Sequence, residues 1–167
     1  MNNSPQAIFE ELARGLPRFT DGRINFTGVR KAPVLNVIVE LDGKILIMKR
    51  SDKVSAYQRL WNGVSGFIDE PKPIEEFVRQ EISEELSIGS ELVGKMSVSD
   101  PYIVEDQDID RVWYVYPVLV SLKKEPKIVL DWEHTDFKWI APSELSKYQY
   151  VKDFDKSVRL ALGYKND

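Results

Sequence analysis

The chain has 167 residues, 43% of them hydrophobic and 30% charged, which excludes a disordered protein and suits one compact domain. It has no cysteine, which excludes disulfides, thiolate metal sites and cysteine nucleophiles. The net charge of −4 argues against a duplex nucleic-acid partner, and because the chain shows neither a signal core nor a membrane-length apolar run, we expect a cytoplasmic protein without membrane contact.

The first half of the sequence predicts a helix, a loop-rich lead-in and a β-hairpin. Residues 5–15 have the spacing of a short amphipathic helix, and the lead-in that follows is expected to stop at Pro33. Residues 34–41 and 44–50 have strand patterns, and Asp42 followed by Gly43 is a strong turn signal between them. We therefore expect two antiparallel strands joined by a tight turn.

The second half predicts strands around one charged helix, followed by two late helices. Gly63 and Gly66 interrupt an apolar strand-like segment, and a turn rich in proline leads into a helix that starts near Pro73. The later elements are β-rich stretches at 91–105 and 111–122 around an acidic loop at 105–110, a strand at 134–140, a short helix at 143–148 and an amphipathic helix at 151–164. Strands therefore dominate the expected fold.

The charged helix carries glutamates on one face. Glu81, Glu84 and Glu85 are spaced i, i+3 and i+4, so their carboxylates crowd one patch of the helix surface. Like charges this close repel, which leaves two interpretations. The patch is either a solvated acidic face or a site for a divalent cation, which oxygen ligands are suited to hold.

The segment from Gly66 to Ile88, GFIDEPKPIEEFVRQEISEELSI, resembles the Nudix box, G-x5-E-x7-R-E-U-x-E-E-x-G-U, where U is a bulky aliphatic residue. The positions that agree with the box are Gly66, Glu81, Ile82, Glu84, Glu85 and Ile88. The positions that depart from it are Lys72 for the first glutamate, Gln80 for the arginine and Ser87 for the last glycine. In the family that glutamate and that arginine are usually tied electrostatically, so Lys72 and Gln80 replace both partners of one interaction.

The resemblance implies an α/β fold, namely a Nudix-like α/β/α sandwich with a mixed β-sheet. It places residues 1–32 in an N-terminal extension and residues 33–167 in a single Nudix hydrolase domain. It also implies metal-dependent hydrolysis of a phosphoanhydride in a nucleoside diphosphate linked to another group X, and this small molecule is the expected partner. The resemblance leaves a homodimer open.

The same resemblance implies a Mg²⁺ (or Mn²⁺) cofactor, because a divalent cation screens phosphate charge and lowers the pKa of bound water. Its expected ligands are three helix carboxylates and one carbonyl oxygen: Glu81, Glu84, Glu85 and Gly66. Glu84 is also an expected catalytic residue.

Two other functions are alternatives to this one. A catalytically weak or silent Nudix-fold nucleotide-binding or sensor module is the alternative, and the departures at Lys72 and Gln80 motivate it. Isopentenyl diphosphate isomerase shares the fold, but its chemistry resembles one that uses a cysteine, which this chain lacks.

Glu133 and His134 precede a predicted strand and are candidates outside the box. Similar Nudix sequences often place a glutamate here as an extra metal ligand or general base, and Glu133 is our second expected catalytic residue. The alternative is that Glu133 is a surface loop residue and that His134, the only histidine in the chain, packs or caps locally.

The segment before the box supplies candidates for substrate binding. Its basic residues suited to charge-assisted bonds with phosphate are Lys49, Arg50 and Arg59. The aromatic residues that can stack on a base are Tyr57 and Trp61 in this segment, with Tyr102 and Trp113 later in the chain. Solvated strand-end charges and ordinary core packing are the alternatives for these two groups.

Overall fold

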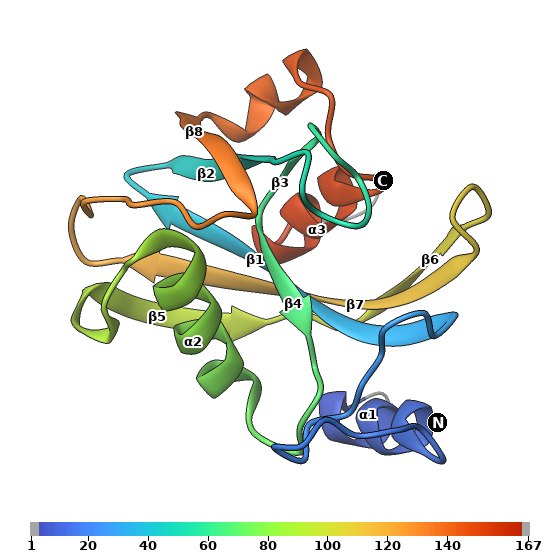
Figure 1. Cartoon of the computed structure of the whole chain (residues 1–167). Helices are drawn as coiled ribbons and strands as arrows, with labels where there is room; N and C mark the ends of the chain where they lie inside the picture. The colour runs from blue at the N-terminus through green and yellow to red at the C-terminus, as the bar shows by residue number, and fades with distance from the viewer. Residues whose placement is uncertain (1–3, 165–167) are drawn as a thin grey trace.

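The computed structural model describes residues 4–164 and shows a mixed β-sheet with helices against both of its faces (Figure 1). The elements in chain order are α1 (Pro5–Ala13), β1 (Lys31–Leu41), β2 (Lys44–Arg50), β3 (Trp61–Asn62), β4 (Val64–Phe67), α2 (Ile74–Leu86), η1 (Ser90–Leu92), β5 (Val93–Val98), β6 (Tyr102–Asp106), β7 (Arg111–Leu122), β8 (His134–Ile140), η2 (Pro142–Lys147) and α3 (Phe154–Ala161). Within residues 4–164, no helix is long and apolar enough to cross a membrane.

Two long parallel strands form the centre of the sheet. β1 and β7 pair in parallel from Lys31 opposite Val112 to Glu40 opposite Ser121. The main path runs β3-β2-β1-β7-β5, while β4 pairs with β1, β6 with β7 and β8 with β2, all antiparallel. Parallel and antiparallel pairs in one sheet confirm the predicted mixed sheet.

Side chains that alternate along the central strands place apolar groups on both faces of the sheet. In β1, Val37 and Val39 belong to the core cluster that contains Phe77 of α2, whereas Ile38 belongs to the cluster that contains Phe154 of α3. α2 and α3 therefore cover opposite faces, which confirms the predicted α/β/α sandwich (Figure 1).

The hairpin prediction is confirmed, and the predicted stop at Pro33 is wrong. Asp42 and Gly43 have φ values of 51° and 78°, the positive values that a two-residue type I′ turn requires. β1 already begins at Lys31 and runs through Pro33. The proline carbonyl accepts a bond from Ile68 N at 2.9 Å, and that bond does not need the N–H that proline lacks.

The lead-in before β1 contributes to the core that α2 covers. Its buried members are Ile24 and Phe26, and α1 before it adds Ile8 and Phe9. The helix expected at 5–15 is confirmed as α1 and ends at Ala13. Residues 1–3 and 165–167, which fall within the expected extension and domain, lie outside the described residues.

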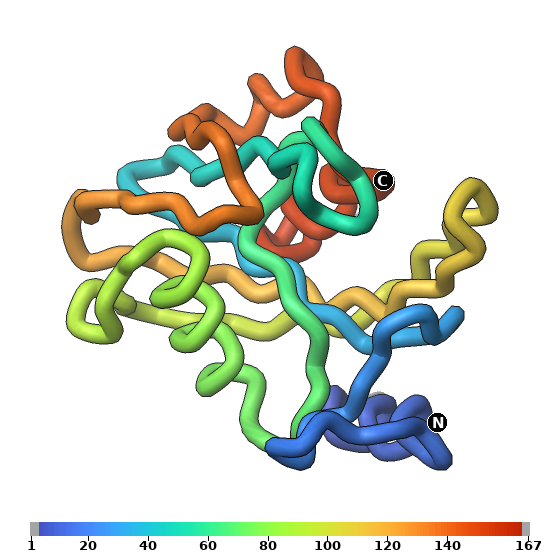
Figure 2. The backbone as a smooth tube through the Cα atoms, in the orientation of Figure 1, coloured from blue at the N-terminus to red at the C-terminus, as the bar shows by residue number. Residues whose placement is uncertain are grey.

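The path from β4 to α2 positions the acidic helix face. In Figure 2 the green segment descends along β4, turns at the lower edge of the molecule and returns upward as α2. The helix therefore lies beside the strand that leads into it. This arrangement brings the second half of α2 next to Gly66 near the end of β4.

Candidate active site

The three box glutamates lie in the last turns of α2 but differ in exposure. Glu84 is exposed, Glu81 is half-buried, and Glu85 is 2% exposed. The helix ends at Ser87, whose φ of 58° is the left-handed conformation that usually favours glycine. Ser87 therefore takes the backbone conformation expected of the family's last glycine, and the helix still ends directly after the carboxylates.

Gly66 leaves room for one of these carboxylates. A Cβ atom at Gly66 would lie 2.6 Å from Glu81 Oε1, a distance that Cβ contacts do not show. The glutamate side chain therefore occupies the space that any other residue at position 66 would fill. The structure brings these two predicted site residues together across the β4–α2 connection.

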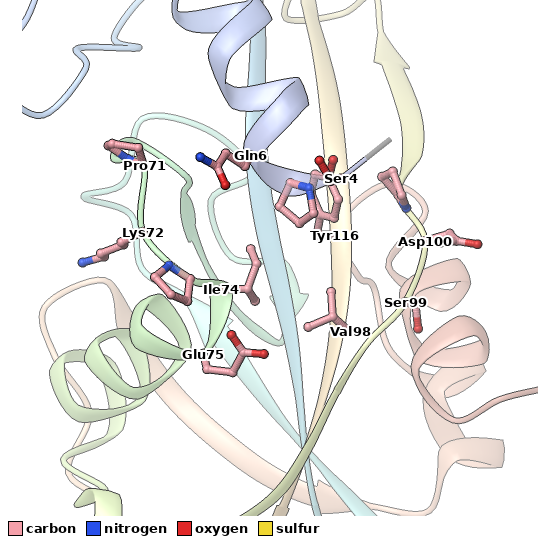
Figure 3. Close-up of a pocket in the computed structure, with 13 residues that line it drawn as sticks. Ser4, Gln6, Pro71, Lys72, Ile74, Glu75, Val98, Ser99, Asp100 and Tyr116 are labelled. Carbon is pink, nitrogen blue, oxygen red and sulfur yellow. The ribbon is translucent and has the colours of Figure 1, made fainter. Parts of the chain in front are cut away.

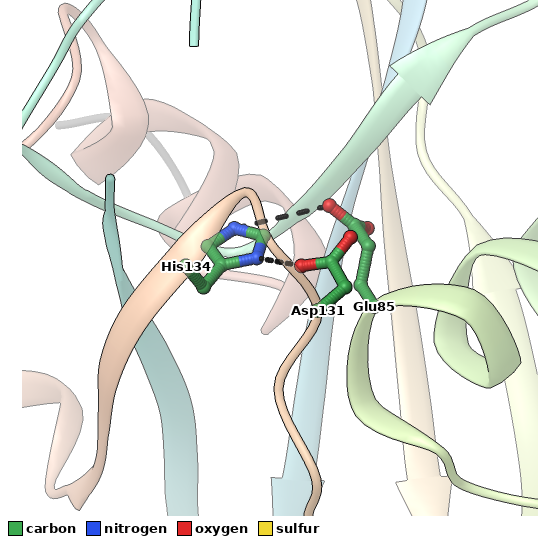
Figure 4. Close-up of side chains that lie close together, drawn as sticks. All are labelled: Glu85, Asp131 and His134. Atoms are coloured by element: carbon green, nitrogen blue, oxygen red, sulfur yellow. Dashed lines mark hydrogen bonds and ion pairs between the residues drawn. The ribbon is translucent and has the colours of Figure 1, made fainter. Parts of the chain in front are cut away.

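A second group of side chains approaches Glu85 from the start of β8 (Figure 4). His134 Nδ1 lies 2.9 Å from Asp131 Oδ1, and His134 Nε2 lies 3.8 Å from Glu85 Oε1. The backbone N–H of Asp131 donates to the carbonyl oxygen of Glu85 at 3.2 Å, which ties this loop to α2. Glu85, Asp131 and His134 offer donor atoms that all lie within 4.8 Å of one another, a spacing that can hold a metal ion.

Burial of this acidic cluster changes its proton affinity. Burial, followed by the charges of Glu84 and Glu133, raises the pKa of Glu81 to about 8. Burial also raises the pKa of Glu85 well above its ordinary value, and the charges of Glu81, Glu133 and Asp131 add to the effect. Both shifts have burial as their main cause, so the folded protein holds protons on these two carboxyl groups more tightly than the unfolded chain does.

The cluster opens into a cavity of about 840 Å³. The predicted site residues that line it are Gly66, Glu81, Glu84, Glu85, Glu133, Arg50 and Tyr57, together with the aromatic candidates Tyr102 and Trp113. Lining residues that the sequence did not single out are Asn36, Asn62, Asp131 and Trp132, among others. Of these, Asp131 had a local signal, since it stands two and three residues before Glu133 and His134.

Arg50 and Tyr57 stabilise the loop that borders the cavity. The Arg50 guanidinium donates from Nε and Nη2 to the carbonyl oxygen of Ala56, at 3.2 Å and 3.0 Å. The Tyr57 hydroxyl donates to Asp106 Oδ2 at 2.7 Å and accepts from Trp113 Nε1 at 3.1 Å. These bonds join the loop after β2 to β6 and β7.

Three predicted substrate-binding residues do not line this cavity. Trp61 packs edge-on against Tyr148, with ring centroids 5.4 Å apart, in the cluster on the α3 side of the sheet. Arg59 is exposed and pairs with Asp52, and Lys49 pairs in register with Trp61. For Lys49 and Trp61 the sequence did not reveal these positions, because strand periodicity gives alternation but not which face of the sheet each set of side chains occupies.

The departures from the box form a connected chain of hydrogen bonds. Lys72 Nζ donates to Gln80 Oε1 at 2.8 Å, and Gln80 Nε2 donates to Glu84 Oε1 at 3.0 Å. Lys72 also forms an ion pair with Glu70 at 3.1 Å. Lys72 and Gln80 therefore form a hydrogen bond with each other, and the amide of Gln80 orients the carboxylate of Glu84.

Another cavity, of about 750 Å³, lies between the start of α1, the start of α2 and the link from β5 to β6 (Figure 3). Its lining includes Lys72, Glu75 and Asp100 but none of the carboxylates in the last turns of α2. The carboxylates of Glu81, Glu84 and Glu85 thus line the first cavity and not this one.

The chain is similar in sequence to known proteins. The NUDIX domain matches residues 29–161 of the chain. Nucleoside triphosphatase NudI of Escherichia fergusonii is 24% identical over 144 residues, which cover 82% of this chain and 98% of the relative.

Solved structures share the fold at low sequence identity. A MutT NUDIX hydrolase from Burkholderia pseudomallei superposes with a TM-score of 0.63 at 21% identity and covers 78% of this chain and 97% of its own. An Ap4A hydrolase of C. elegans superposes with a TM-score of 0.60 at 19% identity, covering 81% and 97%. Because the domain match spans most of the sequence and includes the box, the chain belongs to the Nudix family and is a Nudix pyrophosphohydrolase.

Proposed function

We propose that this chain hydrolyses a phosphoanhydride in a nucleoside diphosphate linked to another group X, with the help of a divalent cation, Mg²⁺ or Mn²⁺. The observation that carries the proposal is the carboxylate cluster at the end of α2, in which Glu85 is buried and which faces a cavity that Arg50 also lines. The sequence similarity to a protein named a nucleoside triphosphatase supports a nucleotide as the substrate. The cytoplasmic location and the homodimer stay predictions.

Two features of the cluster fit a divalent cation. Glu85 Oε2 is buried and has no hydrogen-bond partner within residues 4–164, which is costly for an anionic oxygen unless a cation is bound nearby. Gly66 supplies the second feature, because the missing Cβ lets its backbone and the Glu81 carboxylate approach each other closely. Oxygen donors of this kind match the preference of Mg²⁺.

The proposed ligands are the three helix carboxylates and one carbonyl oxygen: Glu81, Glu84, Glu85 and Gly66. When bound, the cation would screen phosphate charge and make a water molecule more acidic. Glu84 has a further proposed catalytic role, since the Gln80 amide orients its carboxylate. Glu133 lines the same cavity and is the proposed general base that accepts a proton from the attacking water.

Arg50 and Tyr57 are the proposed substrate-binding residues. Arg50 is half-buried in the cavity wall beside Glu85 and Glu133, so its charge lies where a phosphate would approach the cluster. Tyr57 and Trp113 line the same wall and offer aromatic surface for a base. Lys49, Arg59 and Trp61 are not part of this proposal because they lie outside the cavity lining.

The main test of function is a screen of nucleoside triphosphates, dinucleoside polyphosphates and nucleotide sugars with Mg²⁺ and with Mn²⁺, read by product chromatography. We expect cation-dependent cleavage of at least one phosphoanhydride. The alternative is a nucleotide-binding or sensor module, which Lys72 and Gln80 motivate. Binding of a nucleotide without hydrolysis of any compound would support that alternative.

The first prediction concerns Glu85. Glu85→Gln keeps the size of the side chain but removes its charge, so the rate of hydrolysis should fall about a hundredfold or more. The matched control is Glu76→Gln, which changes an exposed glutamate in the first turn of the same helix and should leave the rate unchanged. Near-normal turnover by Glu85→Gln would remove this residue from the ligand set.

The second prediction concerns Gly66. In Gly66→Ala the new Cβ must displace the Glu81 carboxylate, so we expect cation affinity to fall about tenfold or more by calorimetry. Stability should change little, because the displaced group is the far end of a flexible side chain. Gly89→Ala is the control, since its Cβ meets the carboxylate of Glu91 in the same way, and Glu91 does not line the cavity. Equal cation affinity in the two variants would contradict the proposed position of Glu81.

The third prediction follows from the raised pKa of Glu81. Between pH 4.5 and about 8 the folded protein keeps a proton that the unfolded chain has released, so the free energy of unfolding should fall as pH rises through this window. Thermal unfolding of cation-free protein should show this fall, and saturating Mg²⁺ should reduce it at the upper end. Glu81→Gln should make the fall smaller, and the part that remains comes from Glu85, whose pKa is also raised. A cation-free profile that is the same with and without this substitution would show that the carboxylate is not buried as described.

The fourth prediction concerns the departures from the box. Gln80→Arg alone brings a second positive charge beside Lys72, so Tm should fall by about 1–2 °C. Adding Lys72→Glu should restore Tm, because the new pair carries opposite charges. Hydrolysis should be present in the unaltered protein and similar in the double variant. If hydrolysis appears only in the double variant, the sensor alternative is correct.

A further inference from the structure

His134 lies directly against the proposed cation site. It is the only histidine of the chain, it is 6% exposed, and it begins β8 opposite Arg50 of β2. Asp131 Oδ1, 2.9 Å from Nδ1, is a hydrogen-bond acceptor, so Nδ1 carries a proton that it donates to this oxygen. In the neutral ring, Nε2 is then left with a lone pair on the side of Glu85.

The gap between His134 and Glu85 is too long for a hydrogen bond. Nε2 and Glu85 Oε1 lie 3.8 Å apart, and the other carboxylate oxygen, Oε2, is buried without a hydrogen-bond partner among the described residues. Two atoms that each lie about 2.1 Å from one cation can be separated by such a distance. A nitrogen and an oxygen donor therefore face each other at a spacing that suits a shared ion.

The surrounding contacts hold the imidazole in place before any ion binds. The backbone N–H of Asp131 donates to the Glu85 carbonyl oxygen at 3.2 Å, and the backbone N–H of His134 donates to the Asp131 carbonyl oxygen at 3.3 Å. A carboxylate bonded to the outer nitrogen of a histidine is the usual way in which proteins orient a metal-binding ring. Asp131 therefore has the position of an orienting residue, and His134 that of a ligand.

We propose that His134 Nε2 supplies a nitrogen ligand when the site beside Glu85 holds a first-row transition-metal cation, with Asp131 as the positioning residue. This inference rests on the proposed function, because it concerns the same cation site. An imidazole suits first-row transition metals such as Zn²⁺, whereas Mg²⁺ prefers oxygen ligands. The site should therefore bind Zn²⁺ through His134 and bind Mg²⁺ through its carboxylates without the histidine.

The test uses tag-free protein in which histidine is labelled with ¹⁵N, so that the single imidazole is the only labelled ring. Titration with Zn²⁺ should shift the Nε2 resonance strongly and the Nδ1 resonance weakly, whereas Mg²⁺ should leave Nε2 nearly unchanged. Because this readout needs no substitution, a folding defect cannot obscure it.

Calorimetry on variants gives the second readout. Asp131→Asn should weaken Zn²⁺ binding about 10- to 100-fold, and His134→Asn should weaken it at least as much. Both variants should bind Mg²⁺ as the unaltered protein does. Asp136→Asn, at an exposed position of the same strand, is the control and should change neither affinity.

The outcomes separate the inference from the proposed function. If Zn²⁺ binds by calorimetry while the Nε2 resonance stays in place, His134 is not a ligand, and the carboxylate site stands without it. If neither Zn²⁺ nor Mg²⁺ binds to the unaltered protein, both the inference and the proposed cation site are wrong.

Discussion

The structure depends on one electrostatic constraint, the burial of carboxyl groups at the end of α2. Glu85 is 2% exposed, and Glu81 beside it has a pKa raised to about 8, so the fold places carboxylates where their charged forms are poorly solvated. A buried, unpaired charge costs several kcal/mol, which is a large part of the free energy of unfolding of a typical domain. A bound cation would offset this cost. The neighbouring elements keep the carboxylates in place: Gly66 leaves space for that of Glu81, and the loop before β8 bonds to the backbone of Glu85.

The departures from the family box illustrate how this constraint limits change. The glutamate and arginine of the box are both replaced, yet Lys72 and Gln80 bond to each other, and the Gln80 amide still orients Glu84. Ser87 adopts the left-handed conformation in place of glycine, so the helix ends where the carboxylates require it. The box carboxylates are kept, while Lys72 and Gln80 form a hydrogen bond with each other at the two positions where the family has a glutamate and an arginine.

The sequence predicted the features that depend on local chemistry. The turn at Asp42 and Gly43, the start of α2 near Pro73 and the single acidic face of that helix follow from neighbouring residues alone. Contacts between distant segments were beyond its reach, as shown by the approach of Asp131 and His134 to Glu85. The sequence also did not tell which face of the sheet each residue of β3 occupies, because strand periodicity gives alternation only. In the structure Trp61 packs on the α3 side, while Asn62 lines the site.

The most direct test of the central claim is anomalous diffraction from crystals soaked in Mn²⁺. If burial of the carboxylates is coupled to cation binding, an anomalous peak should lie within coordination distance, about 2.2 Å, of carboxylate oxygens of both Glu81 and Glu85. A peak at saturating Mn²⁺ that lies elsewhere on the molecule, with Glu85 still unpartnered, would contradict the account.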